Sequence, residues 1–387
     1  MAASVSGSRR LRILFIVPSL ARAGAERQLV DLVNDLSSEQ FEKHLLSFGT
    51  DTSLSDLVDT NSVALHLERK EGKLDLGLAR RIASIIDEHE IDLVHCTLQN
   101  AMLFGFLALR FSGRRGARLI GVIHTTTNVD WKFELADRFV YQLLLRRFDE
   151  VWFVCHSQAK HWFGKFGFLE PKSCVIYNGV DSRCFEPSKN KEIARPLRDS
   201  LALRPDDAVV SCIAGFRPEK GHDILLKAIR EVVDSNPRAY LLLVGDGPTR
   251  STVEGLVAEL ELTEHVRFLG LLDDVKPVLA MSRCTVLAST SVETFSIAML
   301  ESMSMAVAVV ATDIGGASEA IEDDINGHLV EAGNVASLAA ALARMTDDEQ
   351  HATLMGTNAR FTVTEKFDTV LMVDAAATQL AAMRDQK

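Results

Sequence analysis

The 387-residue sequence lacks three features, and each absence excludes a class of protein. Its apolar runs fall short of the roughly 18 residues that a transmembrane helix needs: the run 101–109, for example, ends at Arg110. None of its six cysteines forms a Cys-x-x-Cys pair, so we expect reduced packing residues in a cytoplasmic protein. Positive charge is not in excess, because the net charge is −11, which argues against nucleic acid as a partner.

The composition is that of an ordinary globular protein, with 47% hydrophobic and 25% charged residues, and the length predicts two or three domains. Near the amino terminus, a basic pair precedes a short apolar stretch, 11–17, which Arg12 interrupts. This pattern favours a first core strand over a signal peptide. The acidic charge lies in the second half, so the first half is the one that could approach an anionic surface.

Short β-branched segments alternate with amphipathic helical ones along the chain. This alternation predicts an α/β fold of parallel sheets covered by helices on both faces. It pauses at a segment rich in proline and charge, which predicts a linker between two sheets. The predicted strands are 13–18, 44–49, 92–96, 118–124 and 151–155 before the linker, and 209–215, 239–245, 266–270, 284–289 and 306–312 after it. The predicted domains are 1–185 and 207–365, with a linker at 186–206 and a carboxyl-terminal helix, 366–387, packing back towards the first domain.

Ligands of open parallel sheets bind outside the carboxyl ends of the strands, and the candidate residues lie at such ends. Gly24 follows the first predicted strand and precedes a helix, where backbone N–H groups favour an anion; a plain turn is the alternative. His124 ends the predicted strand 118–124, where a structural histidine is the alternative. In GFRPEKGH (215–222), Arg217 and Lys220 lie near the positive end of a helix, so an anion between them would offset their charges; solvated surface charges are the alternative.

Further along the chain, SVETFSIAMLESM (291–303) carries two carboxylates eight residues apart. On the predicted helix 294–304, Glu293 lies at the amino-terminal end, where it could be a cap, and Glu301 lies on a neighbouring face among apolar residues. Sugar hydroxyls would be suitable partners for such a carboxylate. The Gly-Gly pair in TDIGGASE (312–319) is a second candidate phosphate-binding turn.

Taken in order and spacing, these motifs resemble one family: the retaining, GT-B-type glycosyltransferases of family four (group 1), which use nucleotide-sugar donors. The similarity runs from LFIVPSLARAGAERQLV through VIYNGVD, RPEKG, LLLVGDGPTR and VRFLG to VVATDIGG and the EKFD segment. It implies two Rossmann-like doubly wound domains that face each other across a cleft. It also implies an enzyme of polysaccharide or glycoconjugate synthesis.

The resemblance implies a role for each matching residue. Arg217 and Lys220 would hold the donor diphosphate and offset charge on the departing nucleotide. Glu301 would bind the ribose hydroxyls, His124 would lie near the transferred sugar, and Gly24 would lie close to the diphosphate.

The sugar itself would be held by Glu293 together with the backbone of the three residues after it. The catalytic group would therefore be His124, Glu293, Arg217 and Lys220. The other donor contacts that the resemblance implies are Asp246, Phe268, Leu269, Gly270, Thr294, Phe295 and Ser296.

Four positions depart from the family pattern. Ala23 stands for the first glycine of a Gly-Gly pair, Gly215 stands for an arginine, and the Gly-Phe-Gly after the first glutamate is Thr-Phe-Ser. Residues 306–308 replace a Gly-x-Pro. The Glu293, Glu301 and Lys220 charges are retained, so we expect an active enzyme.

The sequence has no Asp-x-Asp, which disfavours a metal-dependent, single-domain glycosyltransferase, and we expect no metal and no other cofactor. No residue stands out as the nucleophile of a double displacement, which favours front-face transfer assisted by the leaving phosphate. The expected acceptor is a hydroxyl of a glycan, a lipid-linked sugar or a small molecule. The segment 131–148 mixes aromatic and basic residues and predicts either peripheral contact with the inner membrane face or a core helix with extended arginines.

Two further functions remain open on the same architecture. One is a nucleotide-sugar epimerase or a sugar phosphorylase, and the other is a non-catalytic partner of an active transferase. Screening of donors followed by product analysis would separate them.

Overall fold

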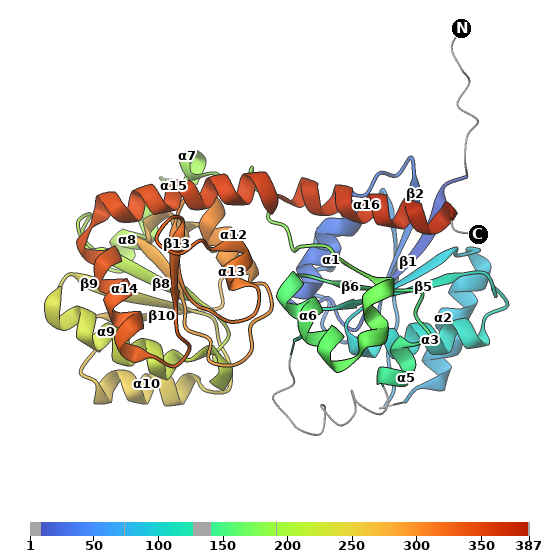
Figure 1. The fold of residues 1–387 in the computed structure, drawn as a ribbon, viewed down its shortest axis with the longest axis horizontal. Coiled ribbons are helices and arrows are strands. Elements are labelled where there is room, and N and C mark those ends of the chain that lie inside the picture. The colour runs from blue at the N-terminus through green and yellow to red at the C-terminus, as the bar shows by residue number, and fades with distance from the viewer. Residues whose placement is uncertain (1–8, 73, 127–140, 191, 386–387) are drawn as a thin grey trace, which may run out of the picture. The chain divides into compact units, whose positions relative to one another are not determined.

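The computed structural model describes residues 9–72, 74–126, 141–190 and 192–385, which form two compact units (Figure 1). The first unit contains the described residues up to 177 and those from 370 onwards. The second unit is formed by residues 178–369. Each unit has its own parallel sheet and its own hydrophobic core.

Among the described residues, the first unit contains a seven-stranded parallel sheet of order β3-β2-β1-β4-β5-β6-β7. The strands are β1 (Leu11–Val17), β2 (Phe41–Ser47), β3 (Val63–Leu67), β4 (Leu93–Thr97), β5 (Arg118–Ile123), β6 (Glu150–Phe153) and β7 (Ser173–Val175). The helices are α1 (Gly24–Asp35), α2 (Leu76–Glu88), α3 (Gln99–Phe111), α5 (Gln142–Leu145), α6 (His156–Lys165) and α16 (Thr369–Asp385), with short 3₁₀ turns η1 (Ser55–Leu57) and η3 (Gly167–Lys172).

Side chains of β1 alternate between two hydrophobic layers, one on each face of this sheet. Leu14 and Ile16 pack with residues of α2 and α3, whereas Ile13, Phe15 and Val17 pack with residues of α1 and α16. Because both faces are covered, the strand is almost continuously apolar, as expected for a parallel sheet. The apolar face of α16, the red helix at the carboxyl terminus in Figure 1, is buried in the second of these layers.

The second unit contains a six-stranded parallel sheet, counted over the described residues, of order β10-β9-β8-β11-β12-β13. Its strands are β8 (Ala208–Ile213), β9 (Ala239–Val244), β10 (Val266–Gly270), β11 (Cys284–Leu287), β12 (Ala308–Thr312) and β13 (Gly327–Val330). Its helices are α7 (Pro187–Asn190), α8 (Ala194–Ser200), α9 (His222–Ser235), α10 (Arg250–Glu259), α11 (Lys276–Met281), α12 (Ile297–Ser304), α13 (Ala317–Ala320), α14 (Val335–Asp347) and α15 (Glu349–Lys366), with the 3₁₀ turn η4 (Pro218–Lys220).

Both sheets reverse their strand order next to their first strand. In the first sheet β1 lies between β2 and β4, and in the second β8 lies between β9 and β11. A reversal of this kind opens a crevice at the carboxyl ends of the central strands, where doubly wound proteins bind ligands. The loops after β8 and β11 therefore flank the position at which a ligand of the second unit is expected.

The predicted α/β class, with two Rossmann-like parallel-sheet domains, is confirmed. Three strands were not predicted from the sequence: β3, β7 and β13. All three lie at sheet edges and are short or half-exposed, so they lack the continuous apolar run of a central strand. The segment predicted as a linker contains α7 and α8, and Ala194 and Leu203 pack in a core cluster of the second unit.

No helix within the described ranges is both long enough and apolar enough to cross a bilayer. The six cysteines all lie in the described ranges and form no disulfide there; Cys184 is exposed, unlike the four that are fully buried. The segment for which membrane contact or a core helix was predicted is 131–148, and its residues 131–140 lie outside the described part of the chain. At its described end, Leu144 and Leu145 are buried and Arg146 lies over the ring of Phe168, 4.5 Å from its centroid.

One buried histidine of the first unit predicts how stability should depend on pH. His95 on β4 lies beside the rings of Phe15 and Trp152, and both of its ring nitrogens are buried without a hydrogen-bond partner. Burial, together with the nearby His124, lowers the pKa of His95 to about 3. In the unfolded chain a histidine has a pKa of about 6.5, so between these values the unfolded state binds the additional proton.

The contribution of His95 to the free energy of unfolding is therefore complete above about pH 6.5 and is lost as the pH falls towards 3. For His95→Leu we expect the slope of the unfolding free energy against pH to decrease by about 1.4 kcal/mol per pH unit within that window. Urea unfolding of both proteins at several pH values measures this slope. Equal slopes would show that His95 is not held neutral in the folded protein.

Candidate functional site

The predicted donor-binding residues of the second unit follow the carboxyl ends of adjacent strands in its sheet. Going across the sheet, Phe268–Gly270 end β10, Asp246 follows β9, Arg217 and Lys220 follow β8, and Glu293 follows β11. The loops after β8 and β11 flank the point where the strand order reverses. The topology thus brings residues that are up to 76 positions apart, Arg217 and Glu293, to one edge of the sheet.

Lys220 and Glu293 form the ion pair at the centre of this edge. Lys220 Nζ donates to Glu293 Oε2 at 2.7 Å, and the two side chains are only 15% and 16% exposed. The hydroxyl of Ser289 donates to the same carboxylate oxygen at 3.0 Å. Because an ammonium group has three N–H donors, Lys220 retains donors for an anion while it holds Glu293.

A left-handed glycine fixes the position of Lys220. Gly221 has φ +64°, and a Cβ atom built there would lie 2.0 Å from the carbonyl oxygen of Ala288. The loop after β8 therefore lies directly against the end of β11, which only glycine permits. The next residue, His222, is buried and stacks on Phe216 at 4.5 Å, and burial with the adjacent Lys220 charge lowers the pKa of His222 to about 4.

Arg217 is positioned differently from Lys220. Its side chain is 57% exposed, and its Nε lies 3.2 Å from Glu219 Oε1. The carbonyl of Glu219 accepts the backbone N–H of Thr290 at 2.8 Å, so Glu219 also connects this loop to the loop after β11. The guanidinium of Arg217 is consequently held at the rim of the edge by a carboxylate.

The residues predicted to flank a nucleoside form a second group beside the first. Phe268 packs against Phe216 with ring centroids 6.0 Å apart, and the guanidinium of Arg250 lies 5.8 Å from the centroid of Phe268. Asp246 is exposed, and its Oδ1 accepts the N–H of Gly247 at 2.7 Å. Half-buried Leu269 packs in an adjacent core cluster, and Gly270 takes φ +69° at the end of β10.

The helical spacing predicted between the two glutamates is wrong. Helix α12 begins at Ile297 and is capped by the side chain of Ser296, which accepts the N–H of Met299 at 3.3 Å. Glu293 lies in the preceding loop and does not cap the helix. Glu301 is half-buried on the second turn of α12, where its carbonyl accepts the N–H of Met305.

The backbone between Glu293 and α12 is held by other parts of the second unit. The carbonyl of Thr294 accepts the N–H of Gly316 at 2.7 Å, and the carbonyl of Phe295 accepts the side-chain amide of Asn178 at 2.9 Å. Gly315 has φ +61°, and a Cβ there would lie 2.1 Å from the carbonyl oxygen of Glu293. The glycine pair predicted as a phosphate turn therefore supports the Glu293 loop by close backbone contact.

Gly24 and His124 lie in the first unit. Gly24 is the exposed first residue of α1, and no side chain caps the helix at Ala23. Glu26 in the first turn is buried near Ser19, and burial raises its pKa. His124 is half-buried just beyond β5, and burial lowers its pKa to about 4, so it is a neutral imidazole at neutral pH.

Several contributors were not identified from the sequence. Ser289 and Asn178 are short polar residues. Ser289 donates to Glu293, four residues further on in the same loop, and Asn178 donates to the carbonyl of Phe295, 117 residues further along the chain. Their order along the sequence carries no signal of these contacts. Glu219 is the middle residue of RPEKG. Because it lies between Arg217 and Lys220 in the sequence, the motif alone did not predict that it pairs with Arg217.

Family models match both halves of the chain. The model described as "Glycosyl transferases group 1" matches residues 194–361, which include Lys220 and Glu293. The model described as "Glycosyltransferase Family 4" matches residues 22–183, which include Gly24 and His124.

Curated relatives and solved structures agree with these models. The chain is 28% identical over 318 residues to N-acetyl-alpha-D-glucosaminyl L-malate synthase of Bacillus anthracis, covering 81% of each chain. It is 29% identical over 294 residues, 73% of this chain and 74% of the other, to a GDP-mannose-dependent alpha-(1-6)-phosphatidylinositol monomannoside mannosyltransferase of Mycolicibacterium smegmatis. The structure of HepE from Anabaena in complex with UDP-glucose matches with TM-score 0.84 and 25% identity, covering 96% of this chain and 100% of that one.

Proposed function

Because this chain belongs to the GT-B-type glycosyltransferases of family four (group 1), and thus uses a nucleotide-sugar donor, we propose that it is a retaining hexosyltransferase that needs no metal ion. It would transfer the sugar from a nucleoside diphosphate to a hydroxyl of a glycan, a lipid-linked or a small-molecule acceptor.

The observation that carries the proposal is the Lys220–Glu293 pair at the switch point of the second sheet. When the glycosidic bond to the diphosphate breaks, negative charge builds on the leaving phosphate. A shielded ammonium group already fixed in place stabilises that charge without reorganising, which lowers the barrier. Arg217 at the rim would add a second cation, so this part of the chain could replace the divalent ion of metal-dependent transferases.

Retention by front-face transfer is supported by the state of Glu293. Its Oε2 accepts hydrogen bonds from Lys220 and Ser289, which suits a carboxylate that holds sugar hydroxyls better than one that attacks the anomeric carbon. In this scheme the acceptor hydroxyl attacks from the face that the diphosphate leaves, and its proton passes to the leaving phosphate oxygen. Neutral His124 would bind a sugar hydroxyl near the transfer point.

The acceptor class rests on similarity. The mycobacterial relative is named for a phosphatidylinositol monomannoside and the Bacillus relative for L-malate, so both lipid-linked and small acceptors occur among similar chains. The HepE complex with UDP-glucose supports a uridine nucleotide donor as strongly as the mannosyltransferase supports a guanosine one. A panel of UDP- and GDP-sugars with acceptors of both kinds therefore covers the proposed range.

We expect transfer from one of these donors to continue at an unchanged initial rate when EDTA is added, and the product to keep the donor's anomeric configuration. Release of nucleoside diphosphate measures the rate, and the one-bond C1–H1 coupling in the NMR spectrum of the product measures its anomeric configuration. A rate that collapses with EDTA and recovers with Mg²⁺ or Mn²⁺ would refute metal independence. An inverted product would refute retention.

A further inference from the structure

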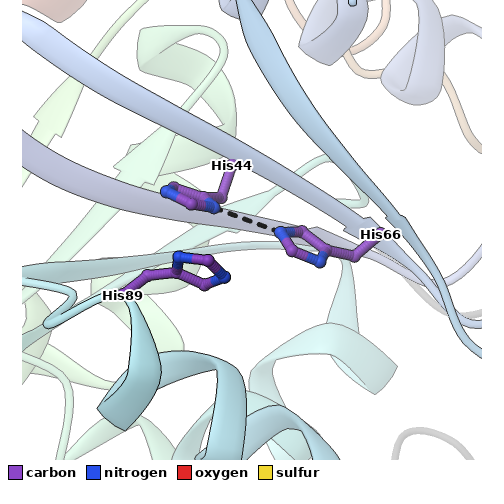
Figure 2. A group of neighbouring side chains, drawn as sticks. All are labelled: His44, His66 and His89. Carbon is purple, nitrogen blue, oxygen red and sulfur yellow. Dashed lines mark hydrogen bonds between the residues drawn. The ribbon is translucent and has the colours of Figure 1, made fainter.

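Three histidines come together at the β2–β3 edge of the first sheet. His44 lies in β2, His66 in β3 and His89 at the carboxyl end of α2 (Figure 2). His66 pairs in register with Leu46, two residues beyond His44, so both histidines project from the face that α2 covers. His89 then completes the group from the end of that helix.

The three imidazoles are arranged as a convergent set of nitrogen ligands. His44 Nδ1 lies 3.1 Å from His66 Nε2, and one nitrogen from each ring lies within 4.8 Å of the other two. The centroid of the His89 ring lies 4.5 Å from the ring centroid of His44 and 5.6 Å from that of His66. In a tetrahedral Zn²⁺ site with Zn–N bonds of about 2.0–2.1 Å, donor nitrogens are roughly 3.3 Å apart, so a small inward shift of His89 would suffice.

The surroundings of His44 also match those of a metal ligand. Its Nδ1 faces His66, and its opposite nitrogen, Nε2, lies 3.6 Å from Glu42 Oε1. A carboxylate on the outer nitrogen orients the ring and leaves the inner nitrogen unprotonated for a metal. Glu42 is itself held near Arg10 and Arg12, at 3.4 and 3.5 Å. His66 and His89 are half-buried, which leaves a route for an ion.

We propose that His44, His66 and His89 bind a divalent transition ion, with Zn²⁺ as the expected metal and water in the fourth position. Three neutral imidazoles are typical ligands of Zn²⁺ and poor ligands of Mg²⁺ or Ca²⁺, which prefer oxygen. The ion would connect two edge-proximal strands to the end of α2. Its role is thus to stabilise the first unit, and it is independent of the transfer chemistry proposed above.

A second group of potential ligands, Asp324, His328 and His351, lies in the other unit. It is the weaker candidate because Asp324 is exposed and already paired with Arg344 at 2.6 Å, a cation that occupies its carboxylate. Variants at His351 therefore provide a matched control for the three-histidine group.

The test is titration of metal-stripped full-length protein with Zn²⁺ in competition with a chromophoric chelator. We expect one equivalent to bind with a Kd of about 1 μM or tighter. Loss of an outer-sphere partner typically weakens a metal site about 10–100-fold, so loss of a ligand in His66→Gln or His89→Gln should weaken binding at least about 100-fold. H351Q and the exposed-site variant H161Q should bind as the wild type does.

Absence of stoichiometric binding in the wild type, or binding that survives H66Q and H89Q but not H351Q, would overturn the proposal. Should either variant fail to fold, the Co²⁺-loaded wild type provides the second measurement. Three paramagnetically shifted imidazole N–H signals in its NMR spectrum would support the site, and fewer than three would overturn it. Zn²⁺ should also raise the Tm of the wild type and leave that of H66Q unchanged.

Discussion

Replacing Lys220 with alanine should lower kcat by about 10²–10³-fold, because it removes a fixed donor to the charge that develops on the departing diphosphate. The ammonium group is only 15% exposed and is held by Glu293 at 2.7 Å, so it needs no reorganisation as the bond breaks. Interactions made mainly in the transition state affect kcat, and those made equally in the ground state affect KM. The decrease should therefore be larger in kcat than in the KM for the donor.

The matched control is Lys227→Ala, seven residues further along in α9, where the side chain is exposed. This variant removes the same charge from the same unit and should leave kcat unchanged. Initial rates over a range of donor concentrations, with the acceptor saturating, measure both parameters. Near-normal turnover in Lys220→Ala, or an equal decrease in Lys227→Ala, would remove the assigned role of Lys220 at the diphosphate.

The central strands could be predicted from the sequence, whereas three of the four edge strands, β3, β7 and β13, could not. A strand such as β8 or β11 is buried on both faces and is apolar except for one small hydroxyl residue, Ser211 or Thr285. Edge strands are paired on one side only, and β3 carries His66 where an apolar residue would have marked it. The same histidine contributes to the proposed metal site, so the residue that obscured the strand has its own chemical explanation.

The sequence predicted which loops carry the candidate site, but not how the side chains in those loops pair. Strand ends and glycine turns are local features, so they located Lys220, Glu293 and Asp246 at one edge of the second sheet. The pairings within the edge depend on side-chain directions that spacing does not encode. Arg217 pairs with Glu219, which lies between two cations in the sequence. Glu293 lies in the loop before α12, because the helix begins at Ile297 and Ser296 supplies its cap.

Replacing Gly221, the glycine that positions Lys220, should impair transfer as strongly as replacing Lys220 does. In Gly221→Ala the new Cβ would lie 2.0 Å from the carbonyl oxygen of Ala288, a backbone atom that cannot rotate away, and alanine is strained at φ +64°. We expect the unfolding free energy to fall by about 3 kcal/mol, from overpacking together with the left-handed conformation. Transfer should also be lost in the fraction that stays folded, because the loop carrying Lys220 must move away from β11.

The matched control is Gly255→Ala in the interior of α10, where a Cβ would meet no atom within 4 Å. There the added methyl should stabilise the protein by about 0.5–1 kcal/mol, since glycine is the poorer helix former. Urea unfolding followed by circular dichroism measures both free energies under one set of conditions. The opposite signs follow from the two environments, close backbone contact at Gly221 and open space at Gly255. A decrease of similar size in both variants would mean that the contact between the loop after β8 and the end of β11 does not constrain this glycine.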